Sequence, residues 1–156
     1  EGELTIIGAG ELEESLKAYA KERGMETRVH FLGRVTDEEL YRQIERCDVF
    51  VLPSVMKSEA FGLVQQEAMA FGKPVINTRL ASGVPEVSLD GLTGLTVEPG
   101  NAAALAEAME WMEEHPAERI RMGQAARERV EKEYTMDVMM DRMMGIYQKL
   151  MEDERR

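Results

Sequence analysis

The sequence contains a single cysteine, Cys47, so no internal disulfide can form. Its apolar residues come in short runs, none of which is long enough to cross a bilayer. The sequence shows neither the positively charged n-region nor the apolar h-region of a signal peptide. We therefore expect neither a membrane span nor a signal peptide. Cys47 is expected to fill apolar space as a small side chain, and the cytoplasm is the default compartment for such a chain.

Positive charge is also scarce. The chain has 19 lysines and arginines against 30 aspartates and glutamates, which gives a net charge of -11. This balance argues against DNA or RNA as a partner, because phosphate backbones are bound by surplus lysine and arginine. A small anionic ligand is still compatible with it, since local amides and one or two cations can hold one. No His, Cys or Asp cluster has metal-ligand spacing, so we expect no metal and no other cofactor.

Short apolar runs alternate with longer helical patterns along the whole chain. This alternation is typical of an α/β fold, and we expect a three-layer open parallel sheet with helices on both faces. No change in composition marks a boundary, so one domain is expected over residues 1–156. The expected strands are Leu4–Ile7, Val29–Leu32, Val49–Leu52, Val75–Asn77 and Leu95–Val97.

Several helix boundaries are marked by capping residues. Gly24 is expected to end the first helix, and Thr36 and Glu39 have the spacing of a capping box that starts the second. Asn101 is expected to cap a later helix, and Pro116 to begin the next one.

The last expected helix, from about Asp137, carries a broad apolar stripe. Core packing within this domain is the favoured interpretation, because methionine fills irregular gaps well. The alternative is a docking face for another domain or subunit, with part of the stripe exposed. The stripe consists of Met136, Met139, Met140, Met143, Met144, Tyr147, Leu150 and Met151.

Two glutamates, Glu59 and Glu67, flank a predicted strand-to-helix turn that contains Gly62. A helix that begins at such a turn offers unpaired N–H groups and the positive end of its dipole, which favour a phosphate. Carboxylates beside it can accept hydrogen bonds from sugar hydroxyls. Phosphate and sugar together predict a nucleotide-sugar site.

The simpler alternative is that both glutamates are surface carboxylates near an ordinary helix start. Their position favours the functional interpretation, because ligands of open parallel sheets bind beyond the carboxyl ends of the strands, and both glutamates follow the strand that ends at Leu52–Pro53. The loop Thr78–Glu86 follows the next strand and is expected to border the same crevice.

Gly8 and Gly10 have the spacing that begins a dinucleotide-binding fingerprint. The third glycine would fall at Glu13, which argues against a nucleotide-dependent oxidoreductase. A tight turn that needs positive φ explains both glycines without a ligand.

These segments together resemble the C-terminal domain of the GT-B retaining glycosyltransferases of family 4. The resemblance covers nearly the whole chain, and it includes the two glutamates with seven residues between them. The segments that carry it are Asp48–Ser54, Glu59–Gly62, Glu67–Ala70, Gly72–Val75, Ser82–Glu86 and Asp90–Leu95.

The resemblance implies a role for each part of this region. Glu59 would lie beside the donor-sugar hydroxyls as the catalytic residue, and Glu67 would bind the ribose hydroxyls. Backbone amides near Gly62 would hold the diphosphate, and the loop after Leu32 would hold the base. The remaining donor-binding positions would be Ala60, Phe61, Gly62, Leu63 and Val64 at the turn, Gly33, Arg34 and Val35 at the base, and Ser82 and Gly83 on the neighbouring loop.

The chain departs from the family pattern in two ways. Ser82-Gly83 stands where many members have two glycines. The element whose arginine and lysine bind the diphosphate, and the N-terminal acceptor domain, would both precede this sequence. The resemblance therefore implies the donor-binding half of an enzyme, inactive alone.

Four basic residues near the predicted site are expected to be solvated surface charges. They are Arg34, Lys57, Lys73 and Arg79.

The function that the resemblance implies is transfer of a hexose from a nucleotide diphosphate sugar, GDP- or UDP-linked, to an envelope glycan or lipid-linked acceptor. A general likeness to bacterial mannosyl- and rhamnosyltransferases favours GDP-mannose. The whole enzyme is expected in the cytoplasm, associated peripherally with the membrane. The alternatives are a nonenzymatic nucleotide-sugar sensor and half of a sugar-nucleotide epimerase.

Overall fold

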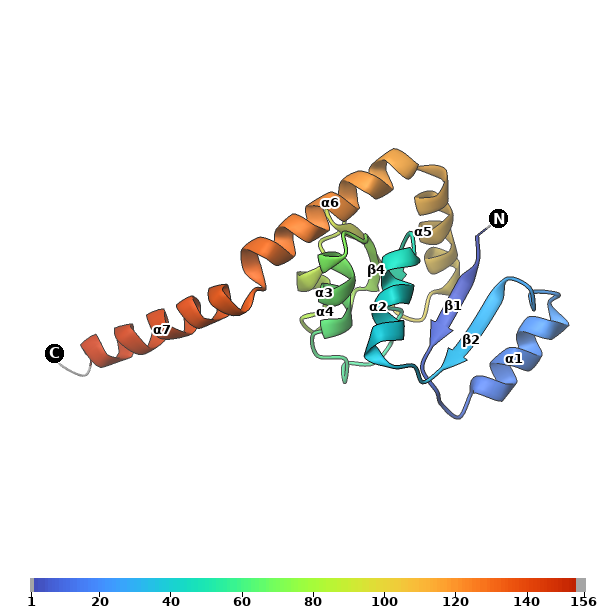
Figure 1. Cartoon of the computed structure of the whole chain (residues 1–156), viewed down its shortest axis with the longest axis horizontal. Coiled ribbons are helices and arrows are strands. Elements are labelled where there is room, and N and C mark those ends of the chain that lie inside the picture. Colours follow the sequence, from blue (N-terminus) through green and yellow to red (C-terminus); the bar gives the residue numbers. More distant parts are fainter. Residues whose placement is uncertain (1, 154–156) are drawn as a thin grey trace. The chain divides into compact units, whose positions relative to one another are not determined.

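The computed structural model describes residues 2–153, and the chain divides into two compact units, unit 1 (Glu1–Arg46) and unit 2 (Cys47–Arg156). Unit 1 contains β1 (Leu4–Ile7), α1 (Glu13–Glu22), β2 (Val29–Gly33) and α2 (Asp37–Arg46) (Figure 1). Unit 2 contains β3 (Phe50–Val51), α3 (Leu63–Ala70), β4 (Val75–Thr78), α4 (Val84–Val87), β5 (Gly94–Val97), α5 (Ala102–Glu114), α6 (Pro116–Glu133) and α7 (Met136–Asp153). The expectation of one domain stays a prediction.

In unit 1, β1 and β2 pair in parallel. Gly8 has a φ of 127° and donates its N–H to the carbonyl of Gly33 at 2.8 Å, which confirms the expected turn. Gly10 is not in a positive-φ conformation, so that part of the expectation is wrong. Thr36 Oγ1 accepts the N–H of Glu39 at 3.3 Å and caps α2 as expected.

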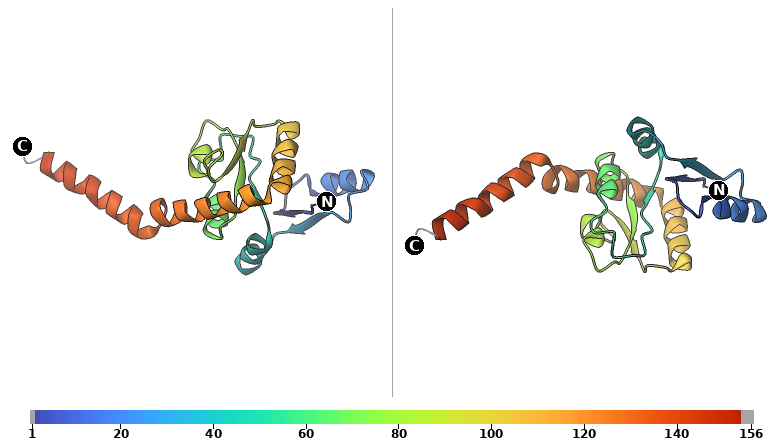
Figure 2. Two further views of the ribbon diagram at one scale, coloured as in Figure 1. Left: turned by 90° about the horizontal axis from the view of Figure 1, so that it is seen from above. Right: turned by 90° about the horizontal axis from the view of Figure 1, so that it is seen from below.

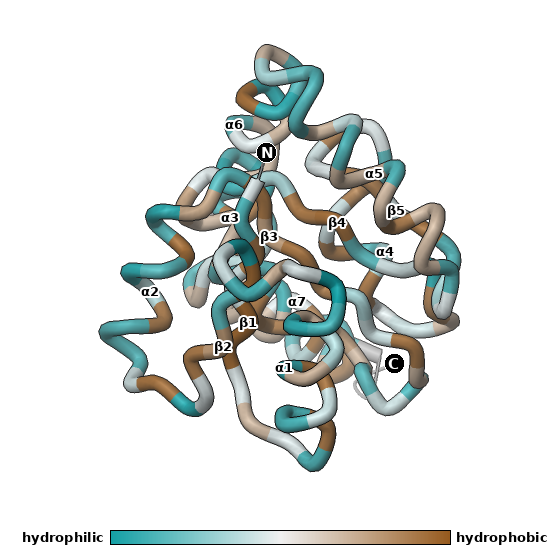
Figure 3. Tube along the Cα trace, turned by 90° about the vertical axis from the view of Figure 1, so that its right-hand side faces the viewer, coloured by the Kyte–Doolittle hydropathy of each residue, from teal (hydrophilic) through white to brown (hydrophobic). Residues whose placement is uncertain are grey.

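Unit 2 is built on the parallel sheet β3-β4-β5. Phe50 pairs with Val75, and Val51 pairs with Ile76. The side chains of two paired residues point to the same face of the sheet. The trace is hydrophobic along β3 and at the start of β4 (Figure 3). The expected caps are confirmed around this sheet, since Asn101 Oδ1 accepts the N–H of Ala104 at 3.0 Å and α6 begins at Pro116.

Two apolar clusters cover the two faces of this sheet. Val75 points into one cluster and the next residue, Ile76, points into the other, as strand periodicity requires. The first cluster contains Met69, Val75, Val87 and Ala126, and the second contains Ile76, Ala108, Met112 and Met122. Helices therefore lie on both faces of the sheet, and the predicted three-layer α/β architecture is confirmed.

The expected strands do not share one ladder. Among the described residues, β1 pairs only with β2, and β3 pairs only with β4, which leaves two sheets. β3 covers only Phe50–Val51 of the expected Val49–Leu52, although the Leu52 N–H still donates to the Ile76 carbonyl at 2.8 Å.

The apolar stripe of α7 is exposed. All eight residues of the predicted stripe expose between 41% and 68% of their surface, so the core-packing interpretation is wrong. α7 contacts α6 near their junction and then continues away from the strands of unit 2 (Figure 2). No helix within residues 2–153 is long and apolar enough to cross a membrane.

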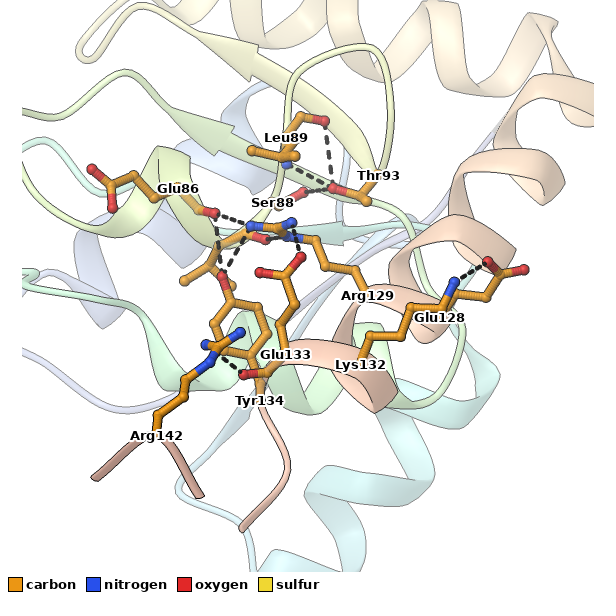
Figure 4. A network of polar contacts seen from close by, with 11 residues as sticks. Glu86, Ser88, Leu89, Thr93, Glu128, Arg129, Lys132, Glu133, Tyr134 and Arg142 are labelled. Atoms are coloured by element: carbon orange, nitrogen blue, oxygen red, sulfur yellow. Dashed lines mark hydrogen bonds and ion pairs between the residues drawn. The ribbon is translucent and has the colours of Figure 1, made fainter. Parts of the chain in front are cut away.

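Arg129 on α6 joins the end of α4 to the end of its own helix (Figure 4). Its guanidinium donates to the carbonyls of Val87 at 3.0 Å and Glu86 at 2.9 Å, and to the Tyr134 hydroxyl at 3.2 Å. Only 18% of its side chain is exposed. The last carbonyls of a short helix are thus satisfied by a half-buried cation, which is favourable at a helix C-terminus.

We predict that Arg129→Met lowers the free energy of unfolding by about 2–3 kcal/mol, because it removes charge-assisted hydrogen bonds to partly buried carbonyls. Arg127→Met is the matched control. Arg127 is 63% exposed and pairs with Glu131 across one helical turn, so its loss should change stability by about 0.5 kcal/mol or less. Urea unfolding of the two variants measures the difference, and equal effects would contradict the role given to Arg129.

Candidate functional site

The candidate site is the turn between β3 and α3. Gly62 ends this turn with a φ of 67°, and α3 begins at Leu63. A Cβ on Gly62 would lie 2.7 Å from Leu52 Cδ2 and 2.9 Å from Gln65 Nε2. Both the left-handed backbone and the close approach of these side chains therefore require glycine.

Glu59 closes the turn. Its Oε1 accepts the N–H of Gly62 at 3.1 Å, and its own N–H donates to the carbonyl of Met56 at 3.1 Å. The half-buried carboxylate is therefore placed immediately before the helix start, where the helix dipole favours negative charge. The Gly62 amide, one of those expected to hold a diphosphate, donates to Glu59 in this structure.

α3 begins with Leu63 and Val64. The N–H groups of these two residues have no carbonyl partner within the helix, because no helical residue lies four positions before them. Glu67, half-buried, follows one helical turn later, at the spacing that places it on the same face as these two residues. The helix start and the second glutamate thus share one side of α3.

The Ser82-Gly83 loop contacts the turn directly. The N–H of Gly83 donates to the carbonyl of Ala60 at 2.8 Å, and a Cβ on Gly83 would lie 2.5 Å from Phe61 Cδ2. Ser82 Oγ accepts the N–H of Val84 at 3.4 Å. Of the residues predicted from the sequence, the structure therefore brings Glu59–Val64, Glu67 and Ser82-Gly83 together.

Phe61 also contacts the end of α6. Its ring meets the ring of Tyr134 edge-on, with centroids 6.1 Å apart, and the Tyr134 hydroxyl donates to the carbonyl of Glu86 at 3.3 Å. Sequence reasoning missed Tyr134. It also missed Gln65 and Asn77, which are fully buried under the turn; an amide within otherwise apolar core positions was the available signal.

The residues predicted to hold the base belong to unit 1. Gly33 ends β2 with a φ of 63°, Arg34 is exposed and Val35 is half-buried. Their role stays a prediction.

Two of the basic residues expected near the site, Arg79 and Lys57, lie at the surface. Arg79 pairs with Glu98 at 2.9 Å and lies 3.9 Å from Asp90, and Lys57 is exposed, as expected for surface charges. Among residues 2–153, no group of three or more His, Cys, Asp or Glu side chains is arranged to hold a metal ion.

An open depression of about 430 Å³ lies between β5 and α5. The carboxylates of Asp90, Glu98 and Glu107 line it beside Trp111. Arg79 pairs with one of these carboxylates, and the negative charge that is left disfavours a phosphate-bearing ligand there. The turn before α3 is therefore the better candidate.

The model of the family Glycosyl transferases group 1 matches residues 2–129. The chain belongs to this family. It is 39% identical over 132 residues to the D-rhamnosyltransferase WbpZ of Pseudomonas aeruginosa, an alignment that covers 85% of this chain and 34% of that protein. It is 31% identical to the GDP-mannose-dependent monoacylated alpha-(1-6)-phosphatidylinositol monomannoside mannosyltransferase of Corynebacterium glutamicum, over 95% of this chain and 39% of that protein.

Among solved structures, sucrose-phosphate synthase from Thermosynechococcus elongatus superimposes with a TM-score of 0.82 at 30% identity. The match covers 97% of this chain and 39% of that one. The resemblance to the C-terminal domain of GT-B glycosyltransferases is confirmed. The chain spans between about a third and two fifths of the length of these relatives.

We predict that Gly62→Ala destabilises unit 2 more than Gly100→Ala does. Both glycines have positive φ, so each substitution costs about 1–2 kcal/mol of backbone strain. Gly100 has no neighbour within 4 Å of a new Cβ, whereas Gly62 has two within 3.0 Å, which adds about 1–3 kcal/mol. Urea unfolding compares the two, and equal losses would mean that the turn does not pack as described.

Proposed function

We propose that this chain is the donor-binding part of a retaining glycosyltransferase that moves a hexose from a nucleoside diphosphate sugar to an acceptor. The observation that carries the proposal is the turn Glu59–Gly62 at the start of α3, with Glu67 one helical turn later, in a chain of the group 1 glycosyltransferase family. The amides of Leu63 and Val64, at the positive end of the helix dipole, would hold the diphosphate.

The same groups support the chemistry of transfer. The bond between the sugar C1 and the diphosphate oxygen breaks, the acceptor hydroxyl forms the new bond to C1 from the same face, and its proton passes to the leaving diphosphate oxygen. Negative charge grows on the leaving diphosphate, where fixed amides and the helix dipole stabilise it. Glu59 accepts the Gly62 N–H through Oε1, and its Oε2 can accept a bond from a hydroxyl of the donor sugar.

The finer proposal is that the donor is GDP-mannose and the acceptor an envelope glycan or lipid-linked glycan. The mannosyltransferase named as GDP-mannose-dependent and the rhamnosyltransferase among the relatives support a donor of this class. We further propose that the whole enzyme acts in the cytoplasm, at the membrane surface, without a metal, and that this chain alone does not transfer sugar because the acceptor domain lies elsewhere.

The exposed stripe of α7 is proposed to dock onto that acceptor domain. The relatives are more than twice as long as this chain, which supplies a partner for the stripe. The stripe is broad, as in helices that pack on an extended surface. On the same helix the acidic Asp137, Asp141 and Glu152 outnumber the basic Arg142 and Lys149, which disfavours an anionic membrane as the occupant.

We expect Glu67→Ala to weaken nucleotide binding by about 1.5–3 kcal/mol, because it removes a charge-assisted hydrogen bond to the ribose. Calorimetric titration of this chain with GDP, UDP, GDP-mannose and UDP-glucose measures the effect. Glu107→Ala, which makes the same charge change at an exposed position on α5, should leave the affinity unchanged. Unaltered affinity in Glu67→Ala would refute the ribose role. If this chain binds none of the four ligands, the titration is repeated with the longer polypeptide, which would supply the expected arginine and lysine, and no binding there would refute the proposed site.

The methionines of α7 should oxidise more slowly in the longer polypeptide than in this chain, because docking would cover them. Mass spectrometry after mild peroxide treatment measures the rate at each methionine. Met109 on α5, which is 37% exposed, serves as the reference and should react equally in both proteins. Equal oxidation rates of the α7 methionines in the two proteins would contradict the docking. Protection of these methionines in this chain alone, through dimers, would also contradict it.

A further inference from the structure

Two amide side chains lie fully buried beneath the turn. Gln65 on α3 and Asn77 on β4 each expose 0% of their surface. Gln65 Nε2 donates to the carbonyl of Phe61 at 2.9 Å and to that of Val84 at 3.1 Å, and its Oε1 accepts from Asn77 Nδ2 at 3.2 Å. A buried amide is tolerated only when its polar atoms are bonded in this way.

Asn77 anchors this arrangement to the sheet. Its Nδ2 also lies within bonding distance of the carbonyls of Val84, at 3.1 Å, and Ser88, at 3.3 Å. Its Oδ1 accepts from Thr96 Oγ1 at 2.8 Å, so β4 and β5 both hold it. Gln65 is therefore placed from the core of unit 2 rather than by its own helix alone.

The bond to Phe61 fixes the direction of one peptide plane. In a trans peptide the carbonyl and the following N–H point in opposite directions. No peptide bond in the described chain is cis, so when Gln65 draws the Phe61 carbonyl inward, the Gly62 N–H faces outward, where it meets Glu59. Glycine at this position leaves the backbone free to adopt other conformations, so a separate contact must select this one.

The same nitrogen joins the two loops of the site. Phe61 lies on the loop before α3, and Val84 begins α4 directly after Ser82-Gly83. The Gly83 N–H to Ala60 carbonyl bond, at 2.8 Å, is a second link beside it. The two loops are therefore held at a fixed separation by one side chain and one backbone bond.

We propose that Gln65, held by Asn77, is a positioning residue for the nucleotide-sugar site. It sets the Phe61–Gly62 peptide plane, and with it the position of Glu59 and the first amides of α3, without touching the ligand. The inference rests on the proposed function for the identity of the ligand, a nucleoside diphosphate sugar.

The test is Gln65→Met, which keeps the length and approximate volume of the side chain and removes its hydrogen bonds. Gln66→Met, on the adjacent residue of the same helix, is the matched control. The amide resonances of Gly62 and Leu63 in a ¹⁵N–¹H spectrum without ligand report the peptide plane, and calorimetry reports the affinity for GDP and UDP. Gln65→Met should shift both resonances and weaken binding about tenfold, and Gln66→Met should change neither.

Thr96→Val keeps the test informative if Gln65→Met does not fold. This substitution removes the donor to Asn77 Oδ1 and leaves residue 65 as glutamine. It should shift the Gly62 and Leu63 resonances less than Gln65→Met does, and it should weaken binding less. If Gln65→Met folds, unchanged Gly62 and Leu63 resonances in it would overturn the inference. If only Thr96→Val folds, unchanged resonances in that variant would overturn it.

The two claims fail in different ways. If neither this chain nor the longer polypeptide binds nucleotide, the proposed function fails, while the resonances still decide whether Gln65 sets the turn. If the unmodified chain binds and Gln65→Met binds equally well, the positioning role fails and the proposed function stands.

Discussion

The hydrogen bond between Gln65 and Asn77 is the interaction on which the site depends. It lies where α3, β4 and the start of α4 meet, and it carries no contact with solvent. Gln65 also donates to the carbonyls of Phe61 and Val84, and Asn77 Nδ2 lies within bonding distance of the carbonyls of Val84 and Ser88. A polar pair in an apolar core fixes loop geometry that hydrophobic packing, which is non-directional, leaves open.

The net charge of the chain and the charge of its proposed ligand are both negative, so the ligand needs locally positive groups at its site. The turn offers backbone amides and a helix dipole, which are independent of the side-chain total. The carboxylate of Glu59 takes part in the turn itself through the Gly62 N–H. Tyr134 then ties the ring of Phe61 to the end of α6, close to the start of α7, so the proposed docking helix and the site share a structural junction.

Local features of the chain were predictable, and contacts between distant residues were not. Strand periodicity, the Asn101 cap and the Gly62 turn follow from neighbouring residues, and the structure confirms them. The division of the strands into two sheets depends on pairing partners, which composition does not reveal. The α7 stripe has the pattern of a core helix, and only the surrounding fold shows that nothing described covers it. Gln65 was overlooked because its role comes from Phe61 and Val84 carbonyls that the sequence pattern does not display; the ligand roles of Glu59 and Glu67 stay predictions.

A crystal structure of this chain with GDP-mannose tests the central claim most directly. The account predicts diphosphate oxygens within hydrogen-bonding distance of the Leu63 and Val64 amides, with the ribose at Glu67 and the Phe61 carbonyl still bonded to Gln65. A nucleotide bound elsewhere, such as in the depression beside Trp111, or a Phe61–Gly62 peptide turned away from Gln65 in the occupied site, would contradict it.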